Sequence, residues 1–452
     1  MMADADGGSM AARSALRVAL VYVGGPESPA RPVMSPPVGT QLLGSLLLAH
    51  GYPVRIYDTR LQPPELLRGA LAELDPRIVG LSFLSPSAAD AVALARELRA
   101  DGRFVIAGGV HASIHTRTLL ELGVVDCVVR GEGEHALLDI CAAMASGGWP
   151  PPVVEGRPFD DMDLLPDYAD FECYRGLYNR PERFLPAYVQ IGRGCPMKCT
   201  FCELPNRAVF APPRRRFKSV DRVLAEIRTY VARWGVNFVT LVDSIATLNL
   251  PLITELVRRM DAELPRVGLM FNGHVNRFNR ALAEQIGLAQ EGRRDTERIS
   301  VWFGFESGSQ RLLDLMRKET TVEKGVAVAA LCREYDVQLG ANLLLGVPTE
   351  TPDDYARHHD FMATIAPTFP NPNILNPLPG TEMYDYCTAH ALLRDPADCS
   401  IWTHTDIAER GHGPVVGVDY DLVLDAYYRY REDERPDADL LGPPRHQPWA
   451  AG

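Results

Sequence analysis

The sequence predicts an α/β protein: a doubly wound, Rossmann-like parallel sheet comes first, followed by a partial (β/α)6 barrel of the TIM type and a small C-terminal cap. Two observations carry this prediction. Apolar runs of strand length alternate with segments of helical periodicity along most of the chain. A connector rich in proline and aspartate, which begins at Trp149, interrupts this alternation and separates two domains.

The predicted domain boundaries follow these changes of pattern. Residues 1–15 are small and polar and are expected to form a disordered extension. The Rossmann-like domain is assigned to residues 16–148, the connector to 149–185, the barrel to 186–394, and the cap with a loose tail to 395–452.

The first domain is predicted from five apolar runs and the helical segments between them. Because such runs are apolar on both faces, they favour a parallel sheet with helices on either side. Ligands of such domains bind at the carboxyl ends of the strands. The predicted strands are Arg17 to Val23, Val54 to Tyr57, Ile78 to Phe83, Phe104 to Ala107 and Cys127 to Val129, and the predicted helices are Gly39 to His50, Pro64 to Leu74, Ala88 to Ala100, His115 to Leu122 and Glu134 to Met144.

The second domain repeats a strand and a helix six times, and a barrel of this kind places its chemistry on the loops after the strands. The predicted strands are Tyr188 to Gly192, Phe238 to Val242, Leu269 to Asn272, Ile299 to Phe305, Leu339 to Leu345 and Ile374 to Asn376. The predicted helices are Ser219 to Trp234, Leu250 to Glu263, Arg280 to Ala289, Gln310 to Met316, Thr321 to Tyr335, Pro352 to Ile365 and Glu382 to Ala391.

Composition limits the classes of function. The 452 residues are 46% hydrophobic and 23% charged, as expected for a globular protein. A net charge of −12 argues against nonspecific binding to nucleic acid and permits a cationic small-molecule substrate. Neither a signal-peptide core nor a membrane-length apolar run is visible, so we expect a cytoplasmic protein with no membrane partner.

The basic run Arg214 to Lys218 follows the cysteines and has two interpretations. We favour the one in which it orders the loop beside an anionic group, and the alternative is a surface for a partner.

The main chemical signal is a group of three cysteines, Cys195, Cys199 and Cys202, with C-x3-C-x2-C spacing and no fourth at a regular interval. Three thiolates on one loop can hold three irons of a cubane 4Fe-4S cluster and leave the fourth iron open, whereas four would complete the ligation or make a closed zinc site. The alternative is that these are buried cysteines without a ligand role. The six other cysteines have no metal-ligand spacing and are taken as structural: Cys127, Cys141, Cys173, Cys332, Cys387 and Cys399.

These cysteines and their flanks resemble the radical S-adenosylmethionine (SAM) superfamily. The resemblance implies that SAM binds the open iron and is cleaved reductively to a 5′-deoxyadenosyl radical. It also implies further cofactor-binding residues at the strand ends: Phe201 beside the adenine, Asp243 at the SAM amino group or the substrate, Glu306 and Ser307 at the ribose or methionyl end, and Gly346 in the pocket wall. Phe201 can equally be loop packing. His274, Asn342 and Asn376 are candidates to face the substrate, although a lone histidine is more often structural and either asparagine can cap a turn.

The first domain resembles the cobalamin-binding domain that precedes many radical SAM modules. The resemblance lies in Pro36 to Gly39, in Gly108 and Gly109 with His111, and in Gly131 to Glu134. The chain has no D-x-H-x-x-G motif, which supplies a histidine to cobalt in methionine-synthase-like proteins. Relatives without the motif include proteins that bind cobalamin and proteins that do not. We therefore leave cobalamin open as a cofactor and do not favour it.

Three reactions remain open. The favoured one is dehydration, the C3′ deoxygenation of an aminoglycoside such as paromamine, because the length, the cap and the missing histidine resemble the radical SAM diol-dehydratases of apramycin-type antibiotic biosynthesis. Its expected partners are a cationic sugar substrate, a ferredoxin or flavodoxin reductant and a pathway reductase. The first alternative is cobalamin-dependent C-methylation with a second SAM as methyl donor. The other is a non-catalytic iron–sulfur electron carrier.

Overall fold

The computed structural model describes residues 10–25, 35–178, 185–203, 215–395 and 401–431. The chain divides into two compact units. Unit 1 comprises Met1–Arg180 and Asn206–Lys218, and unit 2 comprises Pro181–Pro205 and Ser219–Gly452. The chain therefore leaves unit 2 after the cysteine segment, returns to unit 1 for a short stretch, and then completes unit 2.

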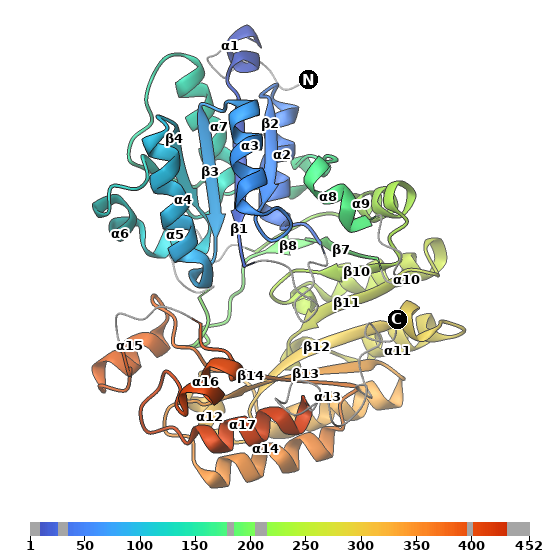
Figure 1. Cartoon of the computed structure of the whole chain (residues 1–452). Coiled ribbons are helices and arrows are strands. Elements are labelled where there is room, and N and C mark those ends of the chain that lie inside the picture. The colour runs from blue at the N-terminus through green and yellow to red at the C-terminus, as the bar shows by residue number, and fades with distance from the viewer. Residues whose placement is uncertain (1–9, 26–34, 179–184, 204–214, 396–400, 432–452) are drawn as a thin grey trace. The chain divides into compact units, whose positions relative to one another are not determined.

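Unit 1 is a six-stranded parallel sheet with the order β2-β1-β3-β4-β5-β6 and helices on both faces (Figure 1). Its core is aliphatic and includes Val21, Val79, Leu81, Val105 and Val128. The strands are β1 Val18–Val23, β2 Val54–Asp58, β3 Ile78–Phe83, β4 Phe104–Gly108, β5 Cys127–Arg130 and β6 Val153–Glu155, and the short β9 Arg216–Phe217 follows in the second stretch. The helices are α1 Met10–Ala15, α2 Val38–Ala49, α3 Pro64–Leu74, α4 Ala88–Ala100, α5 Val110–Ile114, α6 Thr116–Glu121, α7 Gly133–Ala145 and α8 Glu172–Tyr178. The Rossmann-like prediction is confirmed.

Two segments of unit 1 differ from the sequence prediction. Helix α1 lies within residues 1–15, expected to be a disordered extension, because its alanine-rich sequence favours a helix and packs against α7. The stretch 149–185, expected to be a connector, supplies β6 to the sheet and α8 against β2. The strand β6 was missed in the sequence because it has only three residues, too few for a visible period. Residues 1–9 lie outside the described part of the chain.

Unit 2 is an open parallel sheet of six strands in the order β14-β13-β12-β11-β10-β7, with helices between successive strands (Figure 1). This is the predicted partial barrel. The strands are β7 Pro186–Val189, β10 Phe238–Leu241, β11 Gly268–Gly273, β12 Ile299–Glu306, β13 Gln338–Leu345 and β14 Phe369–Ile374, with a short β8 Gly192–Arg193 after β7. The helices are α9 Val220–Trp234, α10 Leu250–Glu263, α11 Arg280–Gln290, α12 Gln310–Leu315, α13 Val322–Glu334, α14 Pro352–Ile365, α15 Glu382–Ala389, α16 His404–Arg410 and α17 Tyr420–Tyr430.

The last strand of unit 2 was misplaced by sequence reasoning. It was predicted at Ile374 to Asn376, but β14 ends at Ile374 and contains Pro370 and Pro372. Proline lacks the backbone N–H with which the residues of a central strand bond to neighbouring strands, so a run with two prolines predicts a loop. β14 tolerates them because it is the edge strand and pairs only with β13. Asn376, which was predicted as the last residue of this strand, therefore lies in the loop after it.

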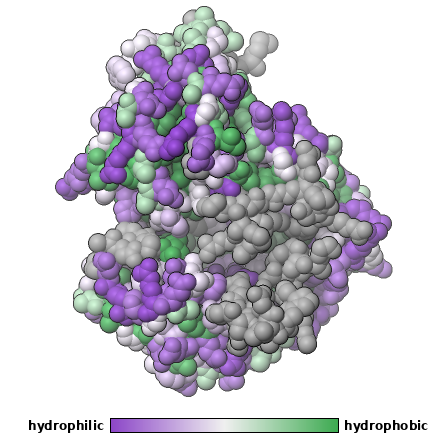
Figure 2. All heavy atoms as spheres, in the orientation of Figure 1, coloured by the Kyte–Doolittle hydropathy of each residue, from purple (hydrophilic) through white to green (hydrophobic). Residues whose placement is uncertain are grey.

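The C-terminal helices pack onto the barrel. Helix α17 contacts β14, β13 and α14, and its apolar side joins a core cluster with Leu345, Tyr355, Trp402 and Ile407. On the face in Figure 2, hydrophilic residues predominate over the described surface, and hydrophobic ones form separate groups. None of the helices within the described ranges has the length and hydropathy to cross a membrane. The tail from residue 432 onward lies outside these ranges.

Candidate functional site

Cys195, Cys199 and Cys202 lie on the loop that follows β7 and the short β8, and all three are partly buried. The loop folds back on itself where the Cys202 amide donates to the Cys199 carbonyl at 3.2 Å. Burial raises the pKa of the Cys199 thiol to about 11, with smaller contributions from Cys202, Glu306 and Cys195, while Lys318 opposes the shift. The three thiols are therefore close enough to influence one another.

The donor set of this loop fits a cubane cluster, because three thiolates can each bind a different iron and leave the fourth iron open. Within the described ranges, no three histidine, cysteine, aspartate or glutamate side chains lie together as a site for one metal ion.

The cysteine loop is fixed from two sides by main-chain hydrogen bonds of Thr200. Its amide donates to the Met316 carbonyl at 3.0 Å, and its carbonyl accepts from the Met383 amide at 2.8 Å. The first contact joins the loop to the turn after α12, and the second joins it to α15. Thr200 was not singled out in the sequence, because its contribution is made by the main chain and leaves no residue-type signal.

Asp243 holds the entrance to the same loop. Its two carboxylate oxygens accept the buried backbone N–H groups of Ile191, at 2.9 Å, and Gly192. Asn272 in turn donates to the Asp243 carbonyl oxygen at 3.1 Å. Both oxygens bond to the chain that leads to Cys195, so Asp243 positions this segment, and its contact with the SAM amino group stays a prediction.

Asp243→Ala is expected to lower both stability and cluster content, because it leaves two buried amide donors without an acceptor, at about 1–3 kcal/mol each. Asp243→Asn keeps one acceptor oxygen and should give an intermediate result. Iron and sulfide content per chain after anaerobic reconstitution, together with denaturant unfolding, measures both effects. Full iron content with unchanged stability in the alanine variant would contradict the positioning role.

Glu306 ends β12 at a bulge and has φ +65, a left-handed conformation that is strained for a residue with a Cβ. Its carboxylate oxygen Oε1 accepts from the Lys318 ammonium at 2.8 Å, and both side chains are buried. Lys318 also lies over the Phe201 ring, 5.9 Å from the ring centroid. Phe201 packs against a cluster that includes Leu312, Leu313 and Met316.

Lys318 is the principal residue that sequence reasoning missed. In the sequence, a single lysine after a short helix looks like an ordinary solvent-exposed residue at a helix end. No regular spacing links it to the cysteines. Only the fold brings it to Glu306 and the cysteine loop. Among the predicted residues, the structure brings together Cys199, Phe201 and Glu306 around it.

A buried glutamate and histidine connect the loops after β12 and β13. Glu350 accepts from the Gly346 amide at 2.6 Å and from the Tyr355 hydroxyl at 2.7 Å, and its Oε1 lies 2.8 Å from His358 Nε2. His358 Nδ1 accepts from the Gly308 amide at 3.0 Å, so Nε2 carries the proton and donates to Glu350. Glu350 is thus bonded within the protein on both carboxylate oxygens.

Ser307 and Gly346 lie on the two loops that this pair connects. The Ser307 hydroxyl accepts from the Ser309 amide at 2.9 Å, which closes the turn after Glu306. Gly346 has φ +76, a conformation that favours glycine, so it forms the turn into Val347 without strain. Ser307 through its hydroxyl and Gly346 through its backbone therefore shape the strand-end loops, and their contact with a cofactor stays a prediction.

His274, at the end of β11, is 3% exposed. Its Nδ1 accepts from the Asn276 amide at 3.1 Å, so the neutral ring carries its proton on Nε2. Burial lowers the pKa of His274 to about 4, and Lys318, Arg277 and Lys324 lower it further. Nε2 has no hydrogen-bond partner among the described residues. A bound polar molecule can supply the acceptor that this buried donor lacks. This side of unit 2 therefore fits a polar ligand.

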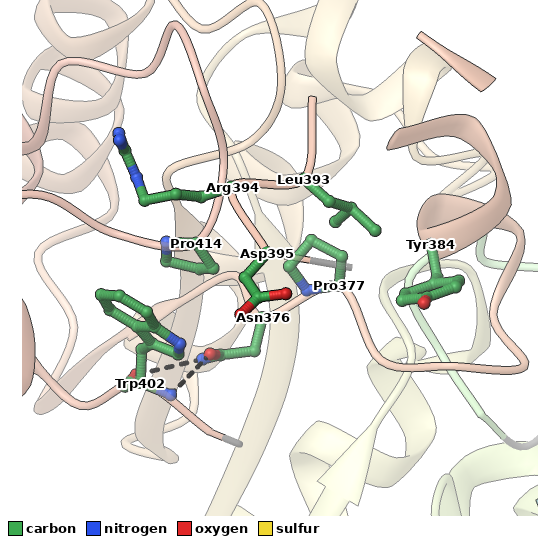
Figure 3. A pocket seen from close by; sticks show the side chains of 8 residues that line it. All are labelled: Asn376, Pro377, Tyr384, Leu393, Arg394, Asp395, Trp402 and Pro414. Carbon is green, nitrogen blue, oxygen red and sulfur yellow. Dashed lines mark hydrogen bonds between the residues drawn. The ribbon is translucent and has the colours of Figure 1, made fainter. Parts of the chain in front are cut away.

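Asn342 and Asn376 are committed to internal contacts. Asn342 accepts from Asn371 at 2.6 Å across the β13–β14 pair. Asn376 accepts from the Trp402 amide at 2.8 Å and donates to the Trp402 carbonyl at 3.2 Å, as the dashed lines in Figure 3 mark. The cavity beside Asn376 measures about 20 Å³, room for one water molecule. Asn376 uses both ends of its amide in these bonds and Asn342 uses its oxygen, so their contact with a substrate stays a prediction.

In unit 1 the ligand side is the carboxyl edge of the sheet. The strand order reverses between β1 and β3, and such a switch point is where doubly wound domains bind ligands. At this edge Gly109 has φ +93, and a Cβ there would meet Ser82 Oγ at 3.4 Å and the Phe83 carbonyl at 3.6 Å. Thr40 Oγ1 and His115 Nε2 are buried without a hydrogen-bond partner in the described ranges.

These features fit a large polar ligand at the carboxyl edge. An exposed glycine lets the backbone approach such a ligand, and the orphaned polar atoms can bond to it. In the basic run of the sequence, Arg216 binds Glu132 and the Phe159 carbonyl within unit 1, and Arg214 lies outside the described residues. The interpretation that this run orders the cysteine loop stays a prediction.

Residues 189–362 match the sequence model described as the Radical SAM superfamily, and residues 30–140 match the one described as the B12 binding domain. The chain is 25% identical to an uncharacterized methyltransferase of Pyrococcus horikoshii, over 79% of this chain and 80% of that protein. It is also 25% identical to the anaerobic magnesium-protoporphyrin IX monomethyl ester cyclase of Rubrivivax gelatinosus, over 77% of this chain and 66% of that protein.

Two solved structures share the fold. The radical SAM methyltransferase TsrM of Kitasatospora setae, with cobalamin and a 4Fe-4S cluster bound, gives a TM-score of 0.67 at 20% identity over 84% of this chain and 76% of that one. The cobalamin-dependent SAM radical enzyme OxsB gives 0.64 at 15% identity over 94% and 63%. The radical SAM resemblance is confirmed, and the expectation that disfavoured cobalamin needs correction, because a B12-binding match does not depend on the missing histidine motif. The chain therefore combines a B12-binding domain with a radical SAM domain.

Proposed function

We propose that the protein is a cobalamin-dependent radical SAM methyltransferase that places a methyl group on a carbon atom of a small molecule. The observation that carries the proposal is the order of the two matched domains in one chain, each with a fitting ligand edge. The methyltransferase of Pyrococcus horikoshii and TsrM support the same reaction class. The finer expectation of aminoglycoside dehydration receives no support from these relatives and is replaced by what was the first alternative.

The overall reaction balances with two molecules of SAM and two electrons. One SAM gives up its methyl group and leaves as S-adenosylhomocysteine, and the other takes the substrate hydrogen and leaves as methionine and 5′-deoxyadenosine. A ferredoxin or flavodoxin is the proposed electron source. Cobalamin supplies the methyl carrier, and the cluster supplies the electron that cleaves SAM.

The residues of this chain bind and orient these groups. In unit 2, Cys195, Cys199 and Cys202 would hold the cluster, and Asp243 fixes the loop that carries them. His274 Nε2 offers a buried donor to an acceptor on SAM or the substrate. In unit 1, the edge around Gly109 would receive cobalamin.

The test uses the full chain, purified without oxygen, reconstituted with iron and sulfide, and mixed with hydroxocobalamin. Methyl-deuterated SAM, dithionite and a panel of small molecules that includes paromamine are then supplied. Methylation is expected to give a product heavier by the labelled methyl group, with S-adenosylhomocysteine and 5′-deoxyadenosine in equal amounts. A product lighter by one water, formed without retained cobalamin, would return the assignment to dehydration, and no deoxyadenosine at all would return it to an electron carrier.

Gly109→Ala is expected to lower cobalamin retention after gel filtration, because a side chain at φ +93 is strained and its Cβ would press on Ser82 and Phe83, which shifts the backbone of the proposed ligand edge. The matched control is Gly123→Ala. Gly123 also has positive φ, +62, but a Cβ there meets nothing within 4 Å. Each change costs about 1–3 kcal/mol of backbone strain, so equal retention by the two variants would contradict a ligand site at Gly109.

A further inference from the structure

Lys318 occupies an unusual position for a lysine. It is 8% exposed, its ammonium is 2.8 Å from Glu306 Oε1, and it lies 5.9 Å from the ring centroid of Phe201. Phe201 stands between Cys199 and Cys202 in the chain. Lysine is rarely buried to this degree unless it is paired, so the pair with Glu306 explains its burial. The pair does not explain why a positive charge lies beside the cysteine loop.

The backbone forces this position. Arg317 and Glu319, on either side of Lys318, have φ +47 and +54, both left-handed and strained for residues with a Cβ. The turn is held at both ends: the Lys318 amide donates to the Leu313 carbonyl at 2.9 Å, and Asn276 donates to the Glu319 carbonyl. Strained residues persist only where the surrounding structure fixes them, so the ammonium is placed by the fold rather than by its own flexibility.

The ammonium also remains charged in this setting. Burial alone would lower the pKa of Lys318, but Glu306, Cys199 and Cys202 outweigh burial and raise the pKa above its usual value. The ammonium lies 5.9 Å from the ring centroid of Phe201, which stands between two of the cysteines, so the fold places this charge beside the cysteine loop.

We propose that Lys318 sets the reduction potential of the iron–sulfur cluster, because its fixed ammonium stabilises the more negative, reduced form. The step is the uptake of one electron by the oxidised cluster from the reductant, with no bond formed or broken in the chain. Charge near a cluster is one of the properties that set its potential. This inference rests on the cluster of the proposed function but not on methyl transfer. The positive charge of Lys318 raises the reduction potential, and the negative charge of Glu306 lowers it.

The experiment is a redox titration of the reconstituted full chain without SAM, with dithionite and mediators, followed by electron paramagnetic resonance. Lys318→Met is expected to lower the midpoint potential, Lys318→Arg to leave it near that of the parent chain, and Glu306→Gln to raise it. The matched control is Lys324→Met, which removes the same charge from an exposed position on α13, where water screens it. It should not change the potential.

Some outcomes would overturn the inference, and others would separate it from the proposed function. A parent-like potential in Lys318→Met with an intact cluster overturns it, as does weaker SAM binding without any change of potential. If Lys318→Met assembles no cluster, an unchanged potential in Glu306→Gln overturns it, and a raised one supports it. A parent chain that forms no cluster would instead contradict the proposed function, and a chain that shows these potentials but transfers no methyl group would leave the role of Lys318 standing.

Discussion

Cys199→Ser is expected to abolish 5′-deoxyadenosine formation and to remove the absorbance of the cluster. A serine hydroxyl is a poor ligand for cluster iron. Loss of a partner outside the ligand shell of a metal already costs about 10–100-fold, so loss of a ligand should exceed about 100-fold. The measurements are iron content, the visible spectrum and deoxyadenosine formed from SAM under dithionite.

The matched control is Cys173→Ser. Cys173 is also partly buried and free, but it lies on α8 of unit 1, away from the cysteine loop in sequence and unit. Burial is the main cause that raises the pKa of its thiol to about 12. Cluster content should stay at the parent level in this variant. Equal loss in both variants would mean that serine substitution damages folding, and full activity in Cys199→Ser would contradict the ligand assignment.

Glu132→Ala is expected to destabilise unit 1 by about 3–5 kcal/mol, because it leaves the buried Arg216 guanidinium without its carboxylate. Arg216 binds both Glu132 oxygens, one of them at 3.0 Å, and donates to the Phe159 carbonyl at 2.7 Å. These bonds hold the stretch that follows the cysteine loop to the turn between β5 and α7. Urea unfolding, combined with hydrogen exchange of β5 and α7, measures the loss.

The control removes both charges. Glu132→Met with Arg216→Met should recover much of the stability, because two apolar side chains of similar size need no ion pair in a buried site. If the double variant is as unstable as Glu132→Ala, shape rather than charge decides stability here. If Glu132→Ala is as stable as the parent chain, the pair contributes nothing, and Glu132 becomes a candidate for direct ligand contact at the carboxyl edge.

The prediction from sequence worked where the signal was local and repeated. Strand runs and helical periods are properties of a few neighbouring residues, so both sheets and most helices were predicted within a few residues. The prediction from sequence failed for short strands that depend on pairing with a neighbouring strand. β6 is held by pairing with β5, and β14 keeps two prolines because it lies at an edge.

The same division applies to the site. The cysteine spacing, the glycine pairs and the acidic strand ends were visible in the chain, because ligand spacing and turn chemistry are local. The roles of the polar residues were not visible, since each depends on what lies across the fold. Asp243 and Glu350 bind backbone amides, and Asn376 binds Trp402, so these side chains hold loops.

The sequence by itself therefore determined two parallel α/β domains, the three cysteines and the radical chemistry that they indicate. Only the tertiary structure decided which charges stand beside those cysteines. Lys318 and Glu306 are separated along the chain and meet because β12 ends in a bulge and the turn after α12 is fixed in a left-handed backbone. A buried ion pair depends on distance and desolvation, which are properties of the packed fold and leave no periodic trace in a sequence.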